Sequence, residues 1–117
     1  MTASTSPNGV IQFRVPAAPL RIELIGELDL ASQRQLDQLL SQLTGGPARD
    51  IVIDLTRVSF LGCAGLEFLT ALREHVSQGG CRVILHAPRR AVVRALRITN
   101  CERLFTVTGL VNGNGSP

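Results

Sequence analysis

The sequence predicts a single α/β domain, with a mostly parallel sheet of four or five strands packed against three or more helices. Strand-like segments take turns with segments in which apolar residues recur at helical spacing. Glycine, proline or asparagine follows the helical segments, so the connections between elements are short. The length of 117 residues leaves room for one domain and little else.

The first two strands are expected at Val10–Val15 and Arg21–Ile25, because both segments alternate apolar and polar residues. Pro16 and Pro19 separate the two segments. They are therefore expected to form an N-terminal β-hairpin with a short turn.

A helix is expected next, with an apolar stripe made of Leu36, Leu39, Leu40 and Leu43. Asp29 or Ser32 is expected to cap its start, and the Gly-Gly-Pro of residues 45–47 ends it. The β-branched run Asp50–Leu55 is typical of a strand that is buried on both faces. Thr56–Leu61 is expected to be a connection.

A second helix is expected to begin near Cys63 and to end at Gly79 and Gly80. Its apolar stripe consists of Leu66, Leu69, Leu72 and Val76, with Phe68 beside it. The next strand is expected at Arg82–Leu85.

Pro88 is expected to open a third helix that turns Val92 and Leu96 inward and ends at Asn100. A last short strand is expected at Leu104–Val107. The domain as a whole is expected to span residues 9–109, between a flexible N-terminus at 1–8 and a flexible C-terminus at 110–117 that are rich in Gly, Ser, Asn and Pro.

The charged residues exclude some function classes. All twelve basic residues are arginine, so Schiff-base chemistry and a phosphate-binding P-loop lysine are excluded. Residues 1–72 carry five Arg against seven acidic residues, whereas residues 73–117 carry seven Arg against two. The basic residues 73–117 are not expected to bind nucleic acid directly, because Trp and Tyr are absent and the Phe side chains lie in apolar segments.

The chain is expected to be cytoplasmic, without a membrane span. The N-terminus has no apolar leader segment, and no run of about 18 apolar residues is present. Cys63, Cys81 and Cys101 lack the spacing of a metal site, so no metal or other cofactor is expected and the thiols are expected to be reduced.

The candidate site is the turn around Cys63, where a glycine joins a buried strand to a helix. Partners of open α/β sheets dock at the carboxyl ends of the strands. Glu27 and Asp29 end the second expected strand. If that strand lies parallel to Asp50–Leu55, both turns open on the same edge of the sheet.

Several segments, in this order, resemble the STAS domain over roughly residues 8–108. They are Gly26–Asp29, Asp50–Leu55, Val58–Leu61 with the following Gly, Gly79-Gly80, Arg82–Leu85, Ala87-Pro88 and Ala91–Leu96. The resemblance implies an anti-sigma factor antagonist, which regulates transcription in a stress response by binding an anti-sigma factor and so releasing a sigma factor. It implies that the partner is a serine kinase and that the chain is not an enzyme.

The sequence departs from the family at the turn that the kinase phosphorylates. Family members read Asp-Ser-(Ser or Thr)-Gly-Leu, where this chain reads Gly62, Cys63, Ala64, Gly65 and Leu66. Cys63 stands at the phosphorylated serine, so the usual switch is absent. The resemblance implies a partner-binding surface made of Leu28, Asp29, Gly62, Cys63, Ala64, Gly65 and Leu66, with Glu67 at its rim; Asp29 is equally well explained as a helix cap.

Two forms of control are open. The antagonist is either constitutive, or controlled through oxidation of Cys63, whose position at a helix start favours the reactive thiolate. Cys81 and Cys101 are its candidate disulfide partners, provided that their Cα atoms come close enough. The oligomeric state is open between a monomer and a weak dimer.

Other functions and surfaces also remain open. The same fold serves as a scaffold or as an accessory subunit of transport machines. A hypothesis of another class is a thiol enzyme or peroxide sensor at Cys63, for which His86 is the nearer candidate base and His75 lies too far along the helix. The arginines of the third helix are either a solvated face or a docking surface for an acidic partner; they are Arg89, Arg90, Arg94 and Arg97.

Overall fold

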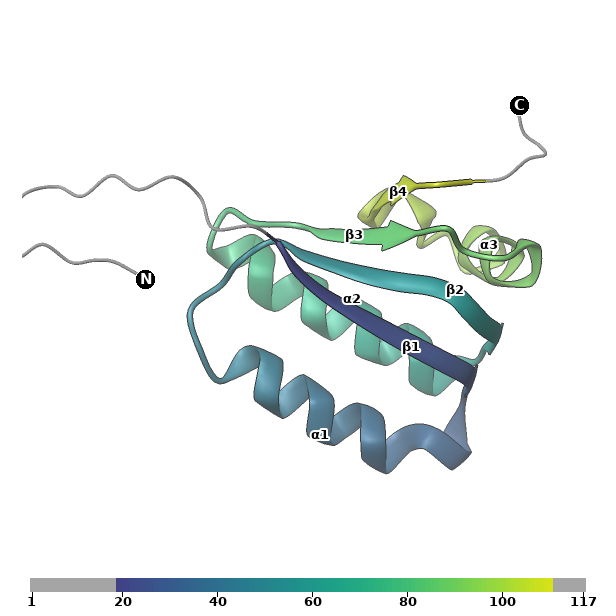
Figure 1. Ribbon diagram of the computed structural model, residues 1–117, viewed down its shortest axis with the longest axis horizontal. Coiled ribbons are helices and arrows are strands. Elements are labelled where there is room, and N and C mark those ends of the chain that lie inside the picture. The colour runs from purple at the N-terminus through teal and green to yellow at the C-terminus, as the bar shows by residue number, and fades with distance from the viewer. Residues whose placement is uncertain (1–18, 111–117) are drawn as a thin grey trace, which may run out of the picture.

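The computed structural model describes residues 19–110, which form a four-stranded sheet with helices beside it (Figure 1). The elements in chain order are β1 (Leu20–Leu28), η1 (Leu30–Ser32), α1 (Gln33–Thr44), β2 (Ile51–Leu61), α2 (Cys63–Gln78), β3 (Val83–His86), α3 (Arg90–Ile98), η2 (Glu102–Leu104) and β4 (Thr106–Thr108). The expected strand at Val10–Val15, and with it the hairpin, lies outside the described residues, as do residues 1–8 and 111–117.

The sheet has the order β1-β2-β3-β4, and every neighbouring pair is parallel. Each connection therefore crosses in the same direction along the sheet. Right-handed crossovers of this kind place all three helices on one face. The predicted α/β class and the parallel sheet are confirmed.

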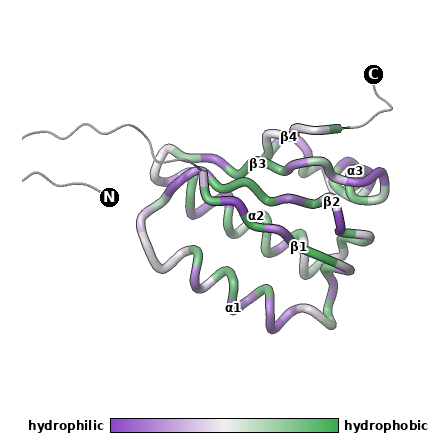
Figure 2. The backbone as a smooth tube through the Cα atoms, viewed as in Figure 1, coloured by the Kyte–Doolittle hydropathy of each residue, from purple (hydrophilic) through white to green (hydrophobic). Residues whose placement is uncertain are grey.

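The core lies between the sheet and the helices. Ile51, Ile53 and Leu55 of β2 are at most 1% exposed, whereas Val52 and Asp54 between them face the other side and are partly exposed. The prediction that this strand is buried on both faces is wrong for the described residues, because all the helices lie on one face. Figure 2 shows the hydrophobic positions gathered along the strands and the helix faces.

β2 begins one residue later than expected and runs six residues past its expected end at Leu55. Thr56–Leu61, expected to be a connection, continues the strand and pairs with β1 up to Leu28 and Leu61. Val58 and Leu61 are buried and hold this extension on the core. The alternation of buried and exposed residues along this extension is irregular because the register with β1 shifts twice. One shift lies beside Gly26, whose φ of 93° suits glycine.

The helix ends agree with the glycine signals, and the starts agree less well. α3 begins at Arg90, two residues after Pro88, because the backbone of the N-cap residue Arg89 is still extended (φ −71°, ψ 164°). Asn100, with a φ of 61°, lies where that helix ends. Asp29 and Ser32 occupy the N-cap positions of η1 and α1, but neither side chain makes a capping hydrogen bond.

Candidate functional site

The two turns expected to share one edge of the sheet do so. Leu28 at the end of β1 pairs with Leu61 at the end of β2, and the Gly62 amide donates to the Leu28 carbonyl at 2.9 Å. The start of α2 and the turn into η1 are therefore held side by side. This places both at the carboxyl edge of the sheet, where partners of such sheets dock.

Gly65 allows α2 to come this close to β1. A Cβ atom at this position would lie 2.8 Å from both the Cβ and the carbonyl oxygen of Leu28, and 2.5 Å from Cδ1 of Leu61. Real Cβ atoms do not approach so closely, so the first turn of α2 requires a glycine here. Leu28, Leu61 and Gly65 thus form a tight junction beneath the turn.

Asp29 lies against the N-cap of α2. A Cβ atom at Gly62 would lie 2.9 Å from Cγ of Asp29 and 3.0 Å from Cε2 of Phe60. No side chain caps this helix start, and the first intrahelical bond runs from the Leu66 amide to the Gly62 carbonyl at 3.0 Å. A carboxylate beside a helix N-terminus is favourably placed in the field of the helix dipole.

The expected contact residues divide by exposure. Cys63 and Glu67 are exposed, and Asp29, Gly62 and Leu66 are partly exposed. The remaining three, which are Leu28, Ala64 and Gly65, are buried. These residues lie beneath the edge and do not form its outer surface.

Three large apolar side chains around the same edge were not among the expected contact residues. Ile25 is 62% exposed, Leu30 72% and Phe60 46%; we call these three the apolar rim. Alternation along β1 places Ile25 on the side of Arg21 and Glu23, away from the core, so the sequence held a signal for it. Phe60 stands first in the segment Phe60–Leu66 that marks the candidate site, but no alternation predicted its exposure because Thr56–Leu61 was expected to be a connection.

Cys63 has neither a disulfide partner nor a histidine base within reach among residues 19–110. The Cys81 amide bonds to the Val76 carbonyl at the far end of α2, about 20 Å along the helix from Cys63. A disulfide needs Cα atoms within about 7 Å. Cys101 is half-buried in the turn that follows α3, and all three cysteines are free. The structure keeps Cys81 far from Cys63, and neither Cys81 nor Cys101 forms a disulfide with it.

His86 does not share the edge with Cys63, contrary to the expectation for a strand-end residue. It pairs with Asp54, and β2 continues for seven more residues to Leu61, which is about 20 Å at the usual rise. His75 lies twelve residues along α2, about 18 Å from Cys63. The thiol-enzyme hypothesis therefore has no histidine base in the described part of the chain.

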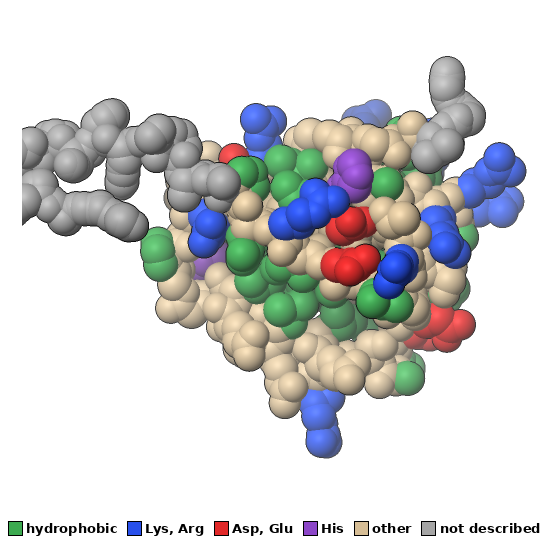
Figure 3. Space-filling view, viewed as in Figure 1, with side chains coloured by type: hydrophobic (Ala, Val, Ile, Leu, Met, Phe, Trp, Pro, Cys, Tyr) green, Lys and Arg blue, Asp and Glu red, His purple; other side chains and the backbone are tan. Residues whose placement is uncertain are grey.

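A polar cluster occupies the sheet face that the helices leave uncovered (Figure 3). Arg21 forms an ion pair with Asp54 at 2.9 Å, and Asp54 also accepts hydrogen bonds from the amide and the hydroxyl of Thr56. These bonds, that of the hydroxyl first, lower the pKa of Asp54 against a smaller opposing effect of burial. Because its groups satisfy one another, the cluster provides no evidence of a binding site.

Within residues 19–110, no three His, Cys, Asp or Glu side chains come together as a metal site would require. Over the same residues, no helix combines the length and apolar character needed to cross a membrane. The edge around Cys63 is thus the site that the fold builds most clearly.

A model of a known family, described as "Mlab, STAS domain", matches residues 11–111. The chain belongs to the STAS domain family. The match covers nearly the whole chain, and it confirms the family that the sequence segments resembled.

Known STAS proteins resemble this chain to different extents. "Anti-sigma-F factor antagonist RsfB" of Mycobacterium tuberculosis is 36% identical over 53 residues, which is 45% of this chain and 43% of that protein, so the match spans less than half the length of the relative. A provisionally assigned anti-sigma factor antagonist from Thermotoga maritima has a TM-score of 0.66 at 20% identity, covering 80% of this chain and 82% of that one. The anti-sigma factor antagonist SpoIIAA, in its unphosphorylated form, has a TM-score of 0.65 at 18% identity, with 87% and 89% covered. At these identities the solved structures establish the STAS fold alone.

Proposed function

We propose that this STAS domain is an anti-sigma factor antagonist that binds its partner at the carboxyl edge of β1 and β2. The observation that carries the proposal is the apolar rim, whose residues lie in the last part of β1, in η1 and at the end of β2, near the edge where the resemblance places the partner. Three exposed large apolar side chains at one edge of a small domain are typical of a protein interface. The similarity to RsfB, an anti-sigma-F factor antagonist by name, supports the same partner class.

The chemistry of the edge suits a protein partner. Ile25, Leu30 and Phe60 supply apolar contact area, and Glu27 and Glu67 are exposed beside them. Neither glutamate has an ion-pair partner among residues 19–110. Apolar anchors with a charged surround are the usual anatomy of an interface, with the anchors contributing most of the affinity.

The antagonist acts constitutively in this proposal. Cys63 and Ala64 carry no hydroxyl, so a serine kinase finds no acceptor at the start of α2. Control by an internal disulfide finds no support, because Cys63 lies about 20 Å along α2 from the bond that holds Cys81. The partner therefore meets the same surface whether or not the kinase is active.

The absence of an acceptor hydroxyl also favours a second candidate. A STAS domain that serves as a scaffold, or as an accessory subunit of a transport machine, needs no phosphorylation switch. It would use the same edge, so the identity of the captured protein separates the two candidates.

The test is capture of partners from the cytoplasm of the source organism on immobilised chain, with and without reductant, followed by mass spectrometry. We expect a kinase-like anti-sigma factor under both conditions, and its loss with Phe60→Asp. Gln42→Asp, which adds the same charge at an exposed position of α1, is the control that should retain it. Recovery of transporter or scaffold proteins in place of an anti-sigma factor would overturn the proposal.

A further inference from the structure

α3 presents a basic outer face. Arg90, Arg94 and Ile98 follow one another at intervals of four residues, so they lie along one stripe of the helix. Val92 and Leu96, on the opposite side, are at most 1% exposed and fix the helix on the core. Ile98 is 75% exposed, which makes it the most exposed large apolar residue of the described chain. We call Arg90, Arg94 and Ile98 the α3 face.

The charge of the α3 face is not neutralised within the described chain. Arg97 pairs with Glu102 at 3.2 Å, and Arg89 donates to the Thr56 carbonyl at 2.9 Å. Arg90 and Arg94, in contrast, have no carboxylate partner among residues 19–110. Residues 73–110 hold seven Arg and two acidic residues, so the field around α3 is positive.

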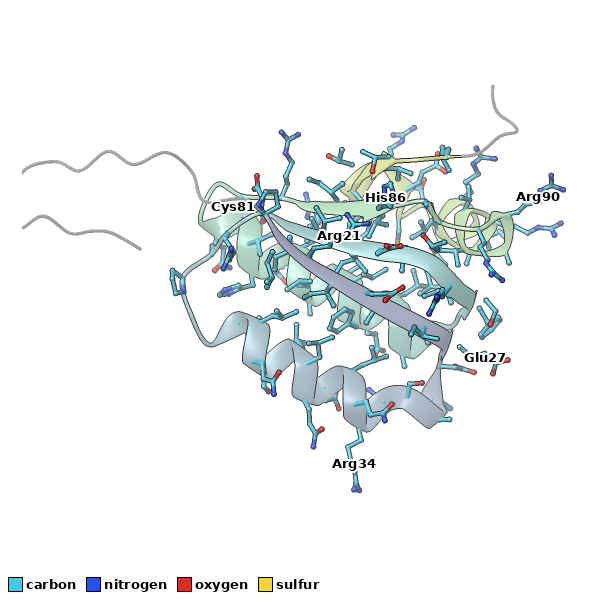
Figure 4. All side chains as sticks on the ribbon, viewed as in Figure 1. Arg21, Glu27, Arg34, Cys81, His86 and Arg90 are labelled. Atoms are coloured by element: carbon cyan, nitrogen blue, oxygen red, sulfur yellow. The ribbon has the colours of Figure 1, made fainter. Side chains whose placement is uncertain are left out.

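The α3 face and the apolar rim lie toward the same end of the molecule. The Arg89 bond to Thr56 attaches the start of α3 to the extension of β2, which carries Phe60 at its other end. In Figure 4, Arg90 and Glu27 both project from this end, whereas Cys81 lies at the opposite end and Arg34 points away from both. One partner can therefore cover the rim and reach α3.

We infer that the α3 face is a second part of the partner's footprint and receives an acidic segment of the same protein. The inference rests on the proposed function, because it assigns the charge of the partner that binds the rim. Two unpaired arginines next to an exposed isoleucine fit a segment that carries carboxylates and an apolar side chain. Arginine suits this role because its planar guanidinium binds carboxylates through two hydrogen bonds. Nucleic acid is the less suitable occupant, since the chain offers no Trp or Tyr for stacking.

The test compares capture of the anti-sigma factor by the wild-type chain and by single charge reversals. Arg90→Glu and Arg94→Glu should each lower its recovery at least tenfold at low salt, while Arg82→Glu, at an exposed position beside Cys81 at the opposite end, should leave recovery unchanged. If the anti-sigma factor is recovered equally by all these chains but lost with Phe60→Asp, the footprint is wrong and the proposed function stands. If the wild-type chain recovers no anti-sigma factor, the proposed function fails and this inference fails with it.

Direct contact is tested by placing the photo-crosslinking residue p-benzoylphenylalanine at position 94, with position 82 as the control. Irradiation of the captured complex should link position 94 to a partner peptide rich in Asp and Glu, and position 82 to none. A crosslink from position 94 to a basic or uncharged peptide would overturn the inference, as would links only to nucleic acid. If the partner is retained but position 94 forms no crosslink to it, that result would also contradict the inference.

Discussion

Replacing Gly65 by alanine tests the junction on which the site is built. The added methyl group would lie 2.5–2.8 Å from atoms of Leu61 and Leu28, one of them a backbone oxygen that cannot rotate away. Either α2 or the end of β1 must therefore move. Overpacking of this kind costs about 1–3 kcal/mol, and alanine returns up to about 1 kcal/mol of helix propensity. We expect Gly65→Ala to lower the free energy of unfolding by about 1–2 kcal/mol.

The measurement is urea denaturation followed by far-UV circular dichroism, since the chain has no Trp or Tyr for fluorescence. Gly46→Ala is the matched control, because a Cβ atom there meets nothing within 4 Å. It should change the free energy of unfolding by no more than about 0.5 kcal/mol. A Gly65→Ala protein as stable as the wild type, with unchanged partner binding, would refute the close approach of α2 to β1.

Three further predictions concern the core, the polar cluster and the thiols. Leu72→Ala, at a fully buried position, should lower the free energy of unfolding by about 2–5 kcal/mol in the same urea assay; a loss below about 1 kcal/mol would contradict its place in the core. Because the pKa of Asp54 is lowered in the folded state, its stabilising effect is present above the unfolded pKa of about 3.9 and is lost as the pH falls through the lower folded value. Thr56→Val removes the hydroxyl that donates to Asp54, so the urea midpoint of the variant should fall less than that of the wild type between pH 5 and pH 2 (roughly the range of this titration). An equal fall of the midpoint in both proteins would argue against the hydrogen bond from Thr56 to Asp54. After treatment with diamide, peptide mapping should find no internal disulfide between Cys63 and Cys81, and detection of one would show that α2 does not hold them apart.

Most of the element order could be predicted, because the signals that carry it are local. Gly79 and Gly80 mark the end of α2, and the β-branched run of residues 50–55 marks the centre of the sheet. The extension of β2 could not be predicted, since it depends on pairing with β1 through two register shifts. For the same reason the distance along β2 that separates His86 from Cys63 could not be predicted from the sequence.

The location of the site in the fold could be predicted more readily than the side chains that form its outer surface. The turn at Cys63 was found because a glycine after a strand and a helix start are local features. Whether Leu28 is buried or Leu30 exposed depends on how α1 and α2 pack against β1, which no local pattern records. The apolar rim and the separation of the cysteines are likewise properties of the assembled fold.

The central claim is that this STAS domain antagonises an anti-sigma factor without a phosphorylation switch. The most direct measurement is transcription in vitro from a sigma-dependent promoter, inhibited by the captured anti-sigma factor and titrated with this chain after incubation with ATP. The chain should restore transcription to the same level with and without ATP, and Phe60→Asp should not restore it. No restoration by the wild-type chain, or restoration that ATP abolishes, would contradict it.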